Sequence, residues 1–379
     1  MNKNKSKTCD KKTDDPNFSI SKNRLFVFFL LLTIVFAVLI IAFSATLNKN
    51  LINNEENAIL SSDWKYSVDG GAFLKTSLPN RISAPPNSKI TLKAMLPSKT
   101  IKGETVLLRT SQQDVEVYVV SELIYDSCTV SETNCHAASA YHFIRIPFYS
   151  ESKEITVVLS SPYKSYSGYM NQIYIGSKAA NIFFIMEENK VRFAIGLFIF
   201  IMGILLISIF VFIKGSKSKF EMIYLGAFFA CAGYWVAAES TLMQFILPYP
   251  ALLTNSSVFA MSLLPVFSSL YYYTSLNHVP KKFGKIVIGI TFTSYLTILL
   301  GALINHALPV QIVPYYLVFA SIYTFTVFGF IAFESAKAHR FFSLPVVGMF
   351  AFGICGLIEL CFYFCDTKGY HQTPSIAVG

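Results

Sequence analysis

The stretch from Phe193 to Ile213 reads FAIGLFIFIMGILLISIFVFI and contains no charged side chain. It reaches the length of about 20 residues that a helix needs to cross the hydrocarbon core of a bilayer. A helix in water keeps a polar face, and this stretch has none. Five comparable segments follow, separated only by short polar breaks: Tyr224–Ile246, Leu252–Tyr273, Ile286–Ile304, Ile312–Phe333 and Phe342–Phe364. Since backbone polar groups in lipid must be satisfied within the segment, the sequence predicts a bundle of six transmembrane helices over 191–364.

The composition agrees with an integral membrane protein that has one modest soluble domain. The chain has 379 residues, of which 53% are hydrophobic and 14% are charged, and its mean hydropathy is +0.50. The net charge of +9 lies mostly in the N-terminal tail and in alternate loops. Such a distribution is typical of a topology signal, so we expect membrane lipids as partners and no nucleic acid.

The N-terminal part predicts a cytoplasmic tail followed by a membrane anchor. Residues 1–24 are polar and basic, and residues 25–47 form an uninterrupted apolar run. This run is longer than the apolar core of a signal peptide, which favours a retained anchor. Cleavage near Ser44–Thr46 is the alternative.

Residues 48–190 have a different character, and they predict an extracytoplasmic β-sandwich. Short alternating runs occur at Val115–Val119, Ile144–Ile146, Ile155–Leu159 and Ile173–Ile175, bounded by turn signals such as Asp69-Gly70-Gly71. Alternation with a period of two is typical of half-buried strands. The predicted fold class is therefore α+β: a β-sandwich sensor domain followed by a helical bundle.

The loops between the apolar segments predict the orientation of the chain. Basic residues concentrate in every second loop: Lys214, Lys217, Lys219, Lys281, Lys282, Lys285, Lys337 and Arg340. By the positive-inside rule, these loops and the N-terminus are cytoplasmic, and the β-sandwich is outside. We therefore expect a multi-pass protein of the cell membrane. Residues 365–379 would be an external loop and the start of an incomplete eighth span, as in a fragment or after a gene lesion.

The sequence suggests two sets of site residues and no catalytic or metal site. Cys128 and Cys135 bracket a short polar segment in the external domain, and we expect them to form a disulfide, with two free thiols as the alternative. Glu239 and Glu359 lie in the outer parts of two predicted spans, where ionisable groups are usually functional. Arg192 stands near the same surface, so we expect it to pair with one of the acids. The alternative is that both acids reach the headgroups or are protonated. Trp235 has the pattern of an interfacial or interhelical aromatic residue. No phosphate-binding loop, nucleophile motif or spaced Cys/His cluster occurs, so we expect no enzyme activity, cofactor or metal.

The arrangement of tail, anchor, external sandwich and helical bundle resembles bacterial receptors with a seven-transmembrane diverse-intracellular-signalling module, as in clostridial membrane-bound diguanylate cyclases. The resemblance rests on the segments Asp63–Tyr66, Asp69–Gly71, Leu78-Pro79, Leu107–Ser111, Val115–Tyr118, Glu122–Tyr125, Tyr224–Gly226, Tyr234-Trp235 and Glu239-Ser240. It implies a jelly-roll sensor domain of the carbohydrate-binding kind and a cytoplasmic output domain, and this chain carries no Gly-Gly-Asp-Glu-Phe signature.

The sequence therefore predicts a signal-input module that senses a small molecule or glycan outside the cell, with a homodimer as one form of assembly. A transporter with an external binding domain is the alternative. Transporters usually carry polar groups near the membrane midplane, whereas Glu239 and Glu359 lie near the outer surface. A protein that merely anchors the sandwich would not need six further helices.

Overall fold

The structure is a computed structural model that describes residues 58–60, 63–97, 104–130, 138–147, 152–209, 216–276, 279–304 and 308–338, together with positions 354 and 358. The predicted tail (1–24), the anchor (25–47) and the chain end (365–379) lie outside the described residues. The sixth predicted span, Phe342–Phe364, does so too, apart from those two positions.

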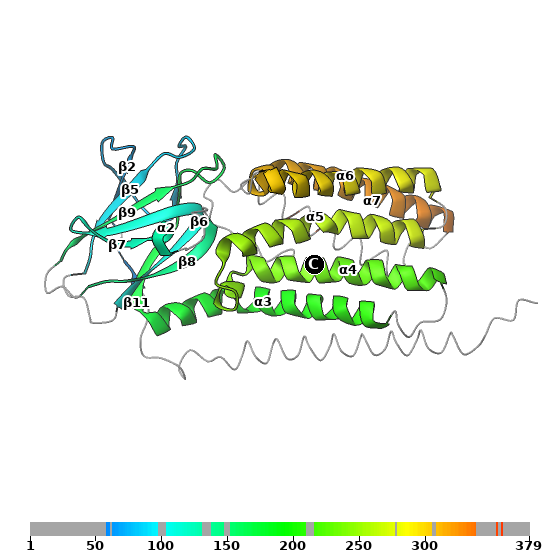
Figure 1. Cartoon of the computed structure of the whole chain (residues 1–379), viewed down its shortest axis with the longest axis horizontal. Coiled ribbons are helices and arrows are strands. Elements are labelled where there is room, and N and C mark those ends of the chain that lie inside the picture. Colours follow the sequence, from blue (N-terminus) through cyan, green and yellow to red (C-terminus); the bar gives the residue numbers. More distant parts are fainter. Residues whose placement is uncertain are drawn as a thin grey trace, which may run out of the picture. The chain divides into compact units, whose positions relative to one another are not determined.

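The first described part, residues 58–177, is rich in strands, and we call it the half-barrel domain (Figure 1). Nine of its strands form one sheet, and β4 and β10 form a separate pair. The strands are β1 (Ala58–Ile59), β2 (Trp64–Val68), β3 (Leu74–Thr76), β4 (Asn80–Arg81), β5 (Ile90–Met95), β6 (Glu104–Val119), β7 (Glu122–Asp126), β8 (Ala138–Arg145), β9 (Glu154–Ser160), β10 (Tyr169–Met170) and β11 (Ile173–Ser177).

Strand β6 is the longest of these strands and joins the two halves of the sheet. Its first half pairs with β11 on one side and β8 on the other, and its second half pairs with β9 and β7. The register shifts between Thr110 and Gln113, and Gln112 between them has a positive φ of 54°. An irregularity of this kind bends a strand. Both halves of β6 consequently contribute residues to one hydrophobic core, such as Val106 and Val117.

The alternating pattern in the sequence is confirmed as strand structure with one buried face. Val115, Val117 and Val119 are at most 1% exposed, and the residues between them are partly exposed. Ile155, Val157 and Leu159 of β9 repeat the pattern. The turn at Asp69-Gly70 also forms as predicted, since both residues have positive φ, at 49° and 77°.

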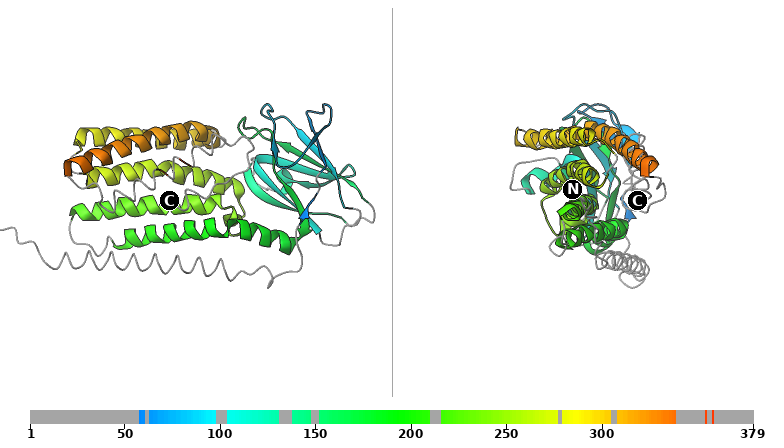
Figure 2. Two further views of the ribbon diagram at one scale, coloured as in Figure 1. Left: turned by 180° about the vertical axis from the view of Figure 1, so that it is seen from behind. Right: turned by 90° about the vertical axis from the view of Figure 1, so that its right-hand side faces the viewer.

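In the described residues that follow the half-barrel domain, five long helices run side by side (Figure 2). They are α3 (Lys178–Ile209), α4 (Ser216–Glu239), α5 (Pro250–Ser275), α6 (Lys281–Ile304) and α7 (Leu308–Ala338). Each is long and apolar enough to cross a membrane. They correspond to the first five of the six segments predicted from the sequence. The described elements also include a short helix α2 (Ser127–Val130) and a 3₁₀ turn η1 (Leu242–Phe245).

Two helix ends differ from the predicted bounds. Helix α3 begins at Lys178, so the expected domain boundary at 190/191 falls inside it. The predicted segment Tyr224–Ile246 is not one helix, because α4 ends at Glu239. The Ser240 hydroxyl donates to the carbonyl of Ala237 at 2.6 Å, and Thr241 has a φ of 61°. A left-handed residue ends a helix, and local hydroxyl hydrogen bonds compete with the helical ones. Glu239 is therefore the last residue of α4.

Helices α3 and α4 are packed against each other at backbone distance. A methyl group on Gly203 of α3 would lie 2.3 Å from the backbone nitrogen of Ala230, and one on Gly233 of α4 would lie 2.2 Å from that of Phe200. Gly196 and Gly226 show the same close approach. Small residues allow helices to approach this closely, and in lipid such packing is a main source of association. The two helices therefore form one tightly joined pair.

Candidate functional site

The half-barrel domain meets the helices through the first half of its sheet, and the chain itself makes the first connection. Strand β11 ends at Ser177 and α3 begins at Lys178, so no linker separates them. The Ser177 hydroxyl accepts a hydrogen bond from the N–H of Ala180 at 3.1 Å. The side chain of Asn181 is fully buried, and its Nδ2 donates to the carbonyl and the hydroxyl of Thr105 in β6 at 3.1 and 2.9 Å. The start of α3 is thereby fixed to the sheet.

A second connection joins the edge strand β8 to the turn between α4 and α5. The side-chain carbonyl of Gln244, in η1, accepts a hydrogen bond from the N–H of Tyr141 at 2.9 Å, and its Nε2 donates to the carbonyl of Tyr141 at 2.7 Å. On its other side, Tyr141 is the ladder partner of Arg109 in β6. The amide of Gln244 thus occupies the place of a further strand residue and satisfies backbone groups that an edge strand otherwise leaves unpaired.

Apolar contacts surround this pair of hydrogen bonds. Leu107, Tyr141 and Ile185 form a buried cluster between the sheet and α3, and Leu242 of η1 packs against it. The rings of Phe143 in β8 and Phe245 in η1 are 6.2 Å apart. Because Tyr141 is only 8% exposed, little water reaches the site. Loss of the glutamine would leave polar groups poorly solvated there.

A third and weaker contact reaches α5. Gln112, the residue at the bend of β6, donates from Nε2 to the hydroxyl of Ser139 at 3.3 Å and to that of Thr254 in α5 at 3.5 Å. Its backbone carbonyl accepts a hydrogen bond from the Ser161 hydroxyl at 2.6 Å. We call the contacts of Asn181, Gln244 and Gln112 the junction. It links the sheet to α3, to the end of α4 and to the start of α5.

Of the charged residues predicted from the sequence, the structure describes Glu239 and Arg192. Glu239 accepts a hydrogen bond from the Ser257 hydroxyl of α5 at 3.1 Å. Among the described side chains no ion pair joins Arg192 to Glu239. Lys190, two residues before Arg192 in α3, pairs with Glu187 at 2.7 Å. Glu359 lies outside the described residues, so its pairing with Arg192 stays a prediction.

Trp235 and the cysteines complete the set of predicted residues. Trp235 packs against a cluster that includes Met261 of α5 and Tyr316 of α7, which makes it an interhelical residue. Cys128 is disulfide-bonded, and its predicted partner Cys135 lies outside the described residues.

The half-barrel domain also holds one unusual histidine, His142, next to Tyr141 in β8. The hydroxyl of Tyr125 lies 2.8 Å from its Nδ1, and the hydroxyl of Thr110 lies 2.9 Å from its Nε2. The Thr110 hydroxyl donates to the carbonyl of Ala138 at 2.9 Å, so it accepts from Nε2–H, and Tyr125 donates to Nδ1. Burial lowers the pKa of His142 from 6.5 to about 4. His142 is therefore a neutral structural residue at pH 7. The described residues contain no group of three or more His, Cys, Asp or Glu suited to a metal ion.

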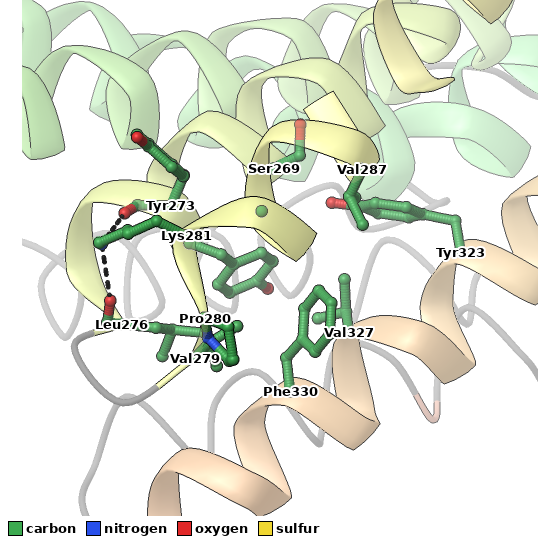
Figure 3. Close-up of a pocket in the computed structure, with 12 residues that line it drawn as sticks. Ser269, Tyr273, Leu276, Val279, Pro280, Lys281, Val287, Tyr323, Val327 and Phe330 are labelled. Carbon is green, nitrogen blue, oxygen red and sulfur yellow. Dashed lines mark hydrogen bonds between the residues drawn. The ribbon is translucent and has the colours of Figure 1, made fainter. Parts of the chain in front are cut away.

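A small pocket lies at the other end of α5, between α5, α6 and α7 (Figure 3). Tyr273, Pro280, Tyr323 and Phe330 are among the residues that line it. Lys281 at its rim donates to the carbonyls of Tyr273 and Leu276 at 2.7 and 3.1 Å, and so holds the end of α5. The pocket has a volume of about 20 Å³, which is room for roughly one water molecule.

Sequence reasoning missed the junction. Gln244 lies within a stretch that reads as the end of a span, Leu242-Met-Gln-Phe-Ile246, and Gln112 lies in the middle of a strand. The only available signal was the amide itself, because a polar side chain inside an apolar run usually has a partner. Compared with known proteins, the sequence matches no protein-family model and no curated protein.

Proposed function

We propose that this chain is the signal-input module of a membrane receptor, in which the half-barrel domain senses a molecule outside the cell and the helices transmit the change. The observation that carries the proposal is the double hydrogen bond between Gln244 and the backbone of Tyr141. A domain that is merely anchored needs only its covalent connection to α3. Here a second, noncovalent connection joins the turn after α4 to an edge strand, so a movement of that strand would be passed to the helices.

The mechanism follows from the order of the strands and helices. Strands β11 and β8 flank the first half of β6. Strand β11 continues directly into α3, and strand β8 is joined through Gln244 to the turn that ends α4. Because α3 and α4 pack at backbone distance, a change in the twist of these three strands moves the two helices as one body. The contacts of α4 to α5 include two side-chain hydrogen bonds, Tyr234–Ser256 at 2.6 Å and Glu239–Ser257 at 3.1 Å, which can exchange partners.

The remaining parts of the proposal rest on the sequence patterns. In it, the N-terminus is cytoplasmic, residues 25–47 are a membrane anchor, and the half-barrel domain is a jelly-roll-like sandwich outside the cell. The resemblance to receptors with a seven-transmembrane diverse-intracellular-signalling module supports this order of parts, and it supports a glycan or small molecule as the ligand. Arg192 and Glu359 would pair at the outer surface. The chain itself has no enzymatic role in this proposal.

A transporter is the second candidate, and the polar side chains of α5 favour it. Ser268 lies 2.7 Å from the hydroxyl of Tyr323 in α7, and Ser269 lies 3.1 Å from that of Thr291 in α6. Hydroxyl groups between helices occur both in transport pathways and as structural hydrogen bonds. Proteoliposomes separate the two functions: a transporter accumulates a labelled sugar or peptide that binds the half-barrel domain, whereas a receptor binds it at the surface only.

The receptor proposal is tested by attaching a reporter. A diguanylate cyclase domain is fused to the chain through one further helix, because the proposed topology leaves residue 379 outside. Cellular cyclic di-GMP is compared between the parent fusion, Gln244→Ala and the matched control Gln113→Ala. Gln113 makes a side-chain hydrogen bond to the carbonyl of Tyr169 at 2.8 Å, within the half-barrel domain.

We expect Gln244→Ala to shift the basal cyclic di-GMP level at equal expression, and Gln113→Ala to leave it near the parent value. Equal levels in all three fusions, with the cyclase active, would contradict a transmitting role for the junction. Arg192→Gln is a further variant in the same assay, and a parental level there would remove only the proposed pairing with Glu359.

A further inference from the structure

Three tyrosines follow one another at intervals of three residues between the end of β9 and β10. The rings of Tyr163 and Tyr166 are 6.3 Å apart and nearly perpendicular, and those of Tyr166 and Tyr169 are 6.0 Å apart. Tyr166 is therefore the middle ring of a row. Tyr163 is buried, whereas Tyr166 and Tyr169 are partly exposed. We call the segment 163–169 the tyrosine loop.

An exposed arginine, Arg81 of β4, lies against this loop. Its guanidinium carbon is 4.4 Å from the centre of the Tyr169 ring, and its Nη2 donates to the carbonyl of Ser165 at 3.2 Å. These two contacts fix the guanidinium on the loop. Within the described residues its other side-chain N–H groups have no protein acceptor, and a guanidinium carries five such donors. The arginine is therefore held in place and still able to bind a ligand.

The tyrosine loop is held in one conformation by its own backbone and by β4. The N–H groups of Tyr166 and Ser167 both donate to the carbonyl of Tyr163, at 3.0 and 2.8 Å. Gly168 has a φ of 96°, and a methyl group there would lie 1.9 Å from the carbonyl oxygen of Ile82, so only glycine fits. A surface that is ordered before a ligand arrives loses little conformational entropy on binding.

Partly exposed tyrosine rings beside an arginine suit a sugar ring that carries a carboxylate. The face of an aromatic ring is electron-rich and attracts the polarised C–H groups on one side of a sugar ring. A guanidinium binds a carboxylate through two parallel hydrogen bonds. The buried end of the row disfavours an anion, because burial and the charge of Asp114 raise the pKa of Tyr163 there. The carboxylate of a ligand therefore fits at the Arg81 end.

The start of the tyrosine loop is connected to the junction by two hydrogen bonds. The N–H of Tyr163 donates to the hydroxyl of Ser161 at 3.2 Å, and that hydroxyl donates to the carbonyl of Gln112 at 2.6 Å. The side chain of Gln112 in turn reaches Thr254 of α5. A ligand that shifts the tyrosine loop would therefore act on the bend of β6 and on α5.

We infer that the tyrosine loop and Arg81 form the binding site for a saccharide with a carboxylate on its ring. The rings of Tyr166 and Tyr169 pack against the sugar, and Arg81 binds the carboxylate. The role of this site in sensing rests on the proposed receptor function. Binding itself does not depend on that function and is measured separately from it.

The test is isothermal titration calorimetry on the full chain in lipid nanodiscs. The acidic probes are trigalacturonic acid and sialyllactose, and their neutral counterparts are the methyl ester of the first and lactose. We expect at least one acidic probe to bind saturably, and about tenfold or more tightly than its neutral counterpart.

Variants locate the binding on the tyrosine loop. Arg81→Gln and Tyr166→Ala should each weaken the binding of the acidic probe by about tenfold or more. Arg81→Lys should lie between the parent and Arg81→Gln, because an ammonium group keeps the charge and loses the planar fork. Arg145→Gln and Tyr118→Ala are the matched controls, since Arg145 is exposed on β8 and Tyr118 is partly exposed on the second half of β6. Both controls should bind like the parent.

Three results would overturn the inference. They are no binding of either acidic probe at millimolar concentrations, neutral counterparts that bind as tightly, and binding that persists unchanged in Arg81→Gln. Because Arg81 is exposed, that variant decides the test even if Tyr166→Ala fails to fold. The cyclic di-GMP fusion separates this inference from the receptor proposal. Binding at the loop without a change in cyclic di-GMP supports the site and contradicts the receptor function, whereas a response to Gln244→Ala without binding of any acidic probe contradicts the site alone.

Discussion

Removing the amide of Gln244 is the most specific perturbation of the junction. In Gln244→Ala, the N–H and the carbonyl of Tyr141 lose their partners on the outer edge of β8. The substitution leaves the covalent path from β11 to α3 and the buried contact between Asn181 and Thr105 unchanged. It therefore separates the noncovalent connection from the rest of the structure.

The size of the effect follows from the two hydrogen bonds. Each neutral hydrogen bond contributes about 0.5–1.5 kcal/mol net, and a buried group left without a partner adds to the loss. Because Tyr141 is only 8% exposed, water replaces the amide poorly. We expect the free energy of local opening at β8 to fall by about 1–3 kcal/mol, which corresponds to roughly 5- to 150-fold faster amide exchange.

Hydrogen–deuterium exchange with mass spectrometry measures this directly, on the full chain in nanodiscs. Peptides that cover β8 and η1 should exchange faster in Gln244→Ala, and peptides that cover β5 and β9 should not change. Gln244→Glu should lie between the parent and the alanine variant, because a carboxylate accepts from the Tyr141 N–H but cannot donate to its carbonyl. Unchanged exchange of the β8 peptide in Gln244→Ala would refute the assignment of Gln244 as the partner of the strand edge.

Three further predictions concern the domain and the helix pair. His142 binds its proton less readily in the folded state than in the unfolded state, so the free energy of unfolding falls by roughly 3 kcal/mol at most as the pH falls from 6.5 to about 4. In His142→Gln, the free energy of unfolding measured by chemical denaturation should depend less on pH over that range. Gly203→Val should destabilise the α3–α4 pair by about 1–3 kcal/mol, because a Cβ would lie 2.3 Å from a backbone atom, whereas Gly289→Val, with no atom within 4 Å, should melt like the parent in detergent. Cys128 should be linked to Cys135 in non-reduced peptide maps, and Cys128→Ser should lower the stability of the domain by about 2–4 kcal/mol; two alkylated thiols in intact protein would contradict the pairing.

Much of the fold could be predicted from the sequence, because the periodicity of apolar residues and the length of apolar segments follow directly from which side chains are buried. The alternation at Val115–Val119 and Ile155–Leu159 identified two central strands. The apolar segments located five helices to within a few turns. These signals are local, so they need no knowledge of which elements are neighbours.

The junction could not be predicted, because it depends on contacts between distant residues. Gln244 and Tyr141 are 103 positions apart, and nothing local indicates that the glutamine faces a strand edge. The hydropathy pattern also predicted a segment, Tyr224–Ile246, that continues through Ser240 and Thr241. In the structure, hydroxyl hydrogen bonds and a positive φ end the helix there. Strand pairing is a further example, since it alone makes Lys65 a cross-strand neighbour of both Lys75 and Lys93.

The central claim is that the junction sets the arrangement of the helices, and a distance measurement at their far ends tests it most directly. Spin labels are placed at Phe220 of α4 and Lys285 of α6, which are both exposed. Double electron–electron resonance in nanodiscs then gives the distance distribution for the parent, for Gln244→Ala and for Gln113→Ala. We predict that Gln244→Ala shifts or broadens the distribution and that Gln113→Ala reproduces the parent. Identical distributions in all three proteins would show that the helices do not respond to the junction, and would contradict the account.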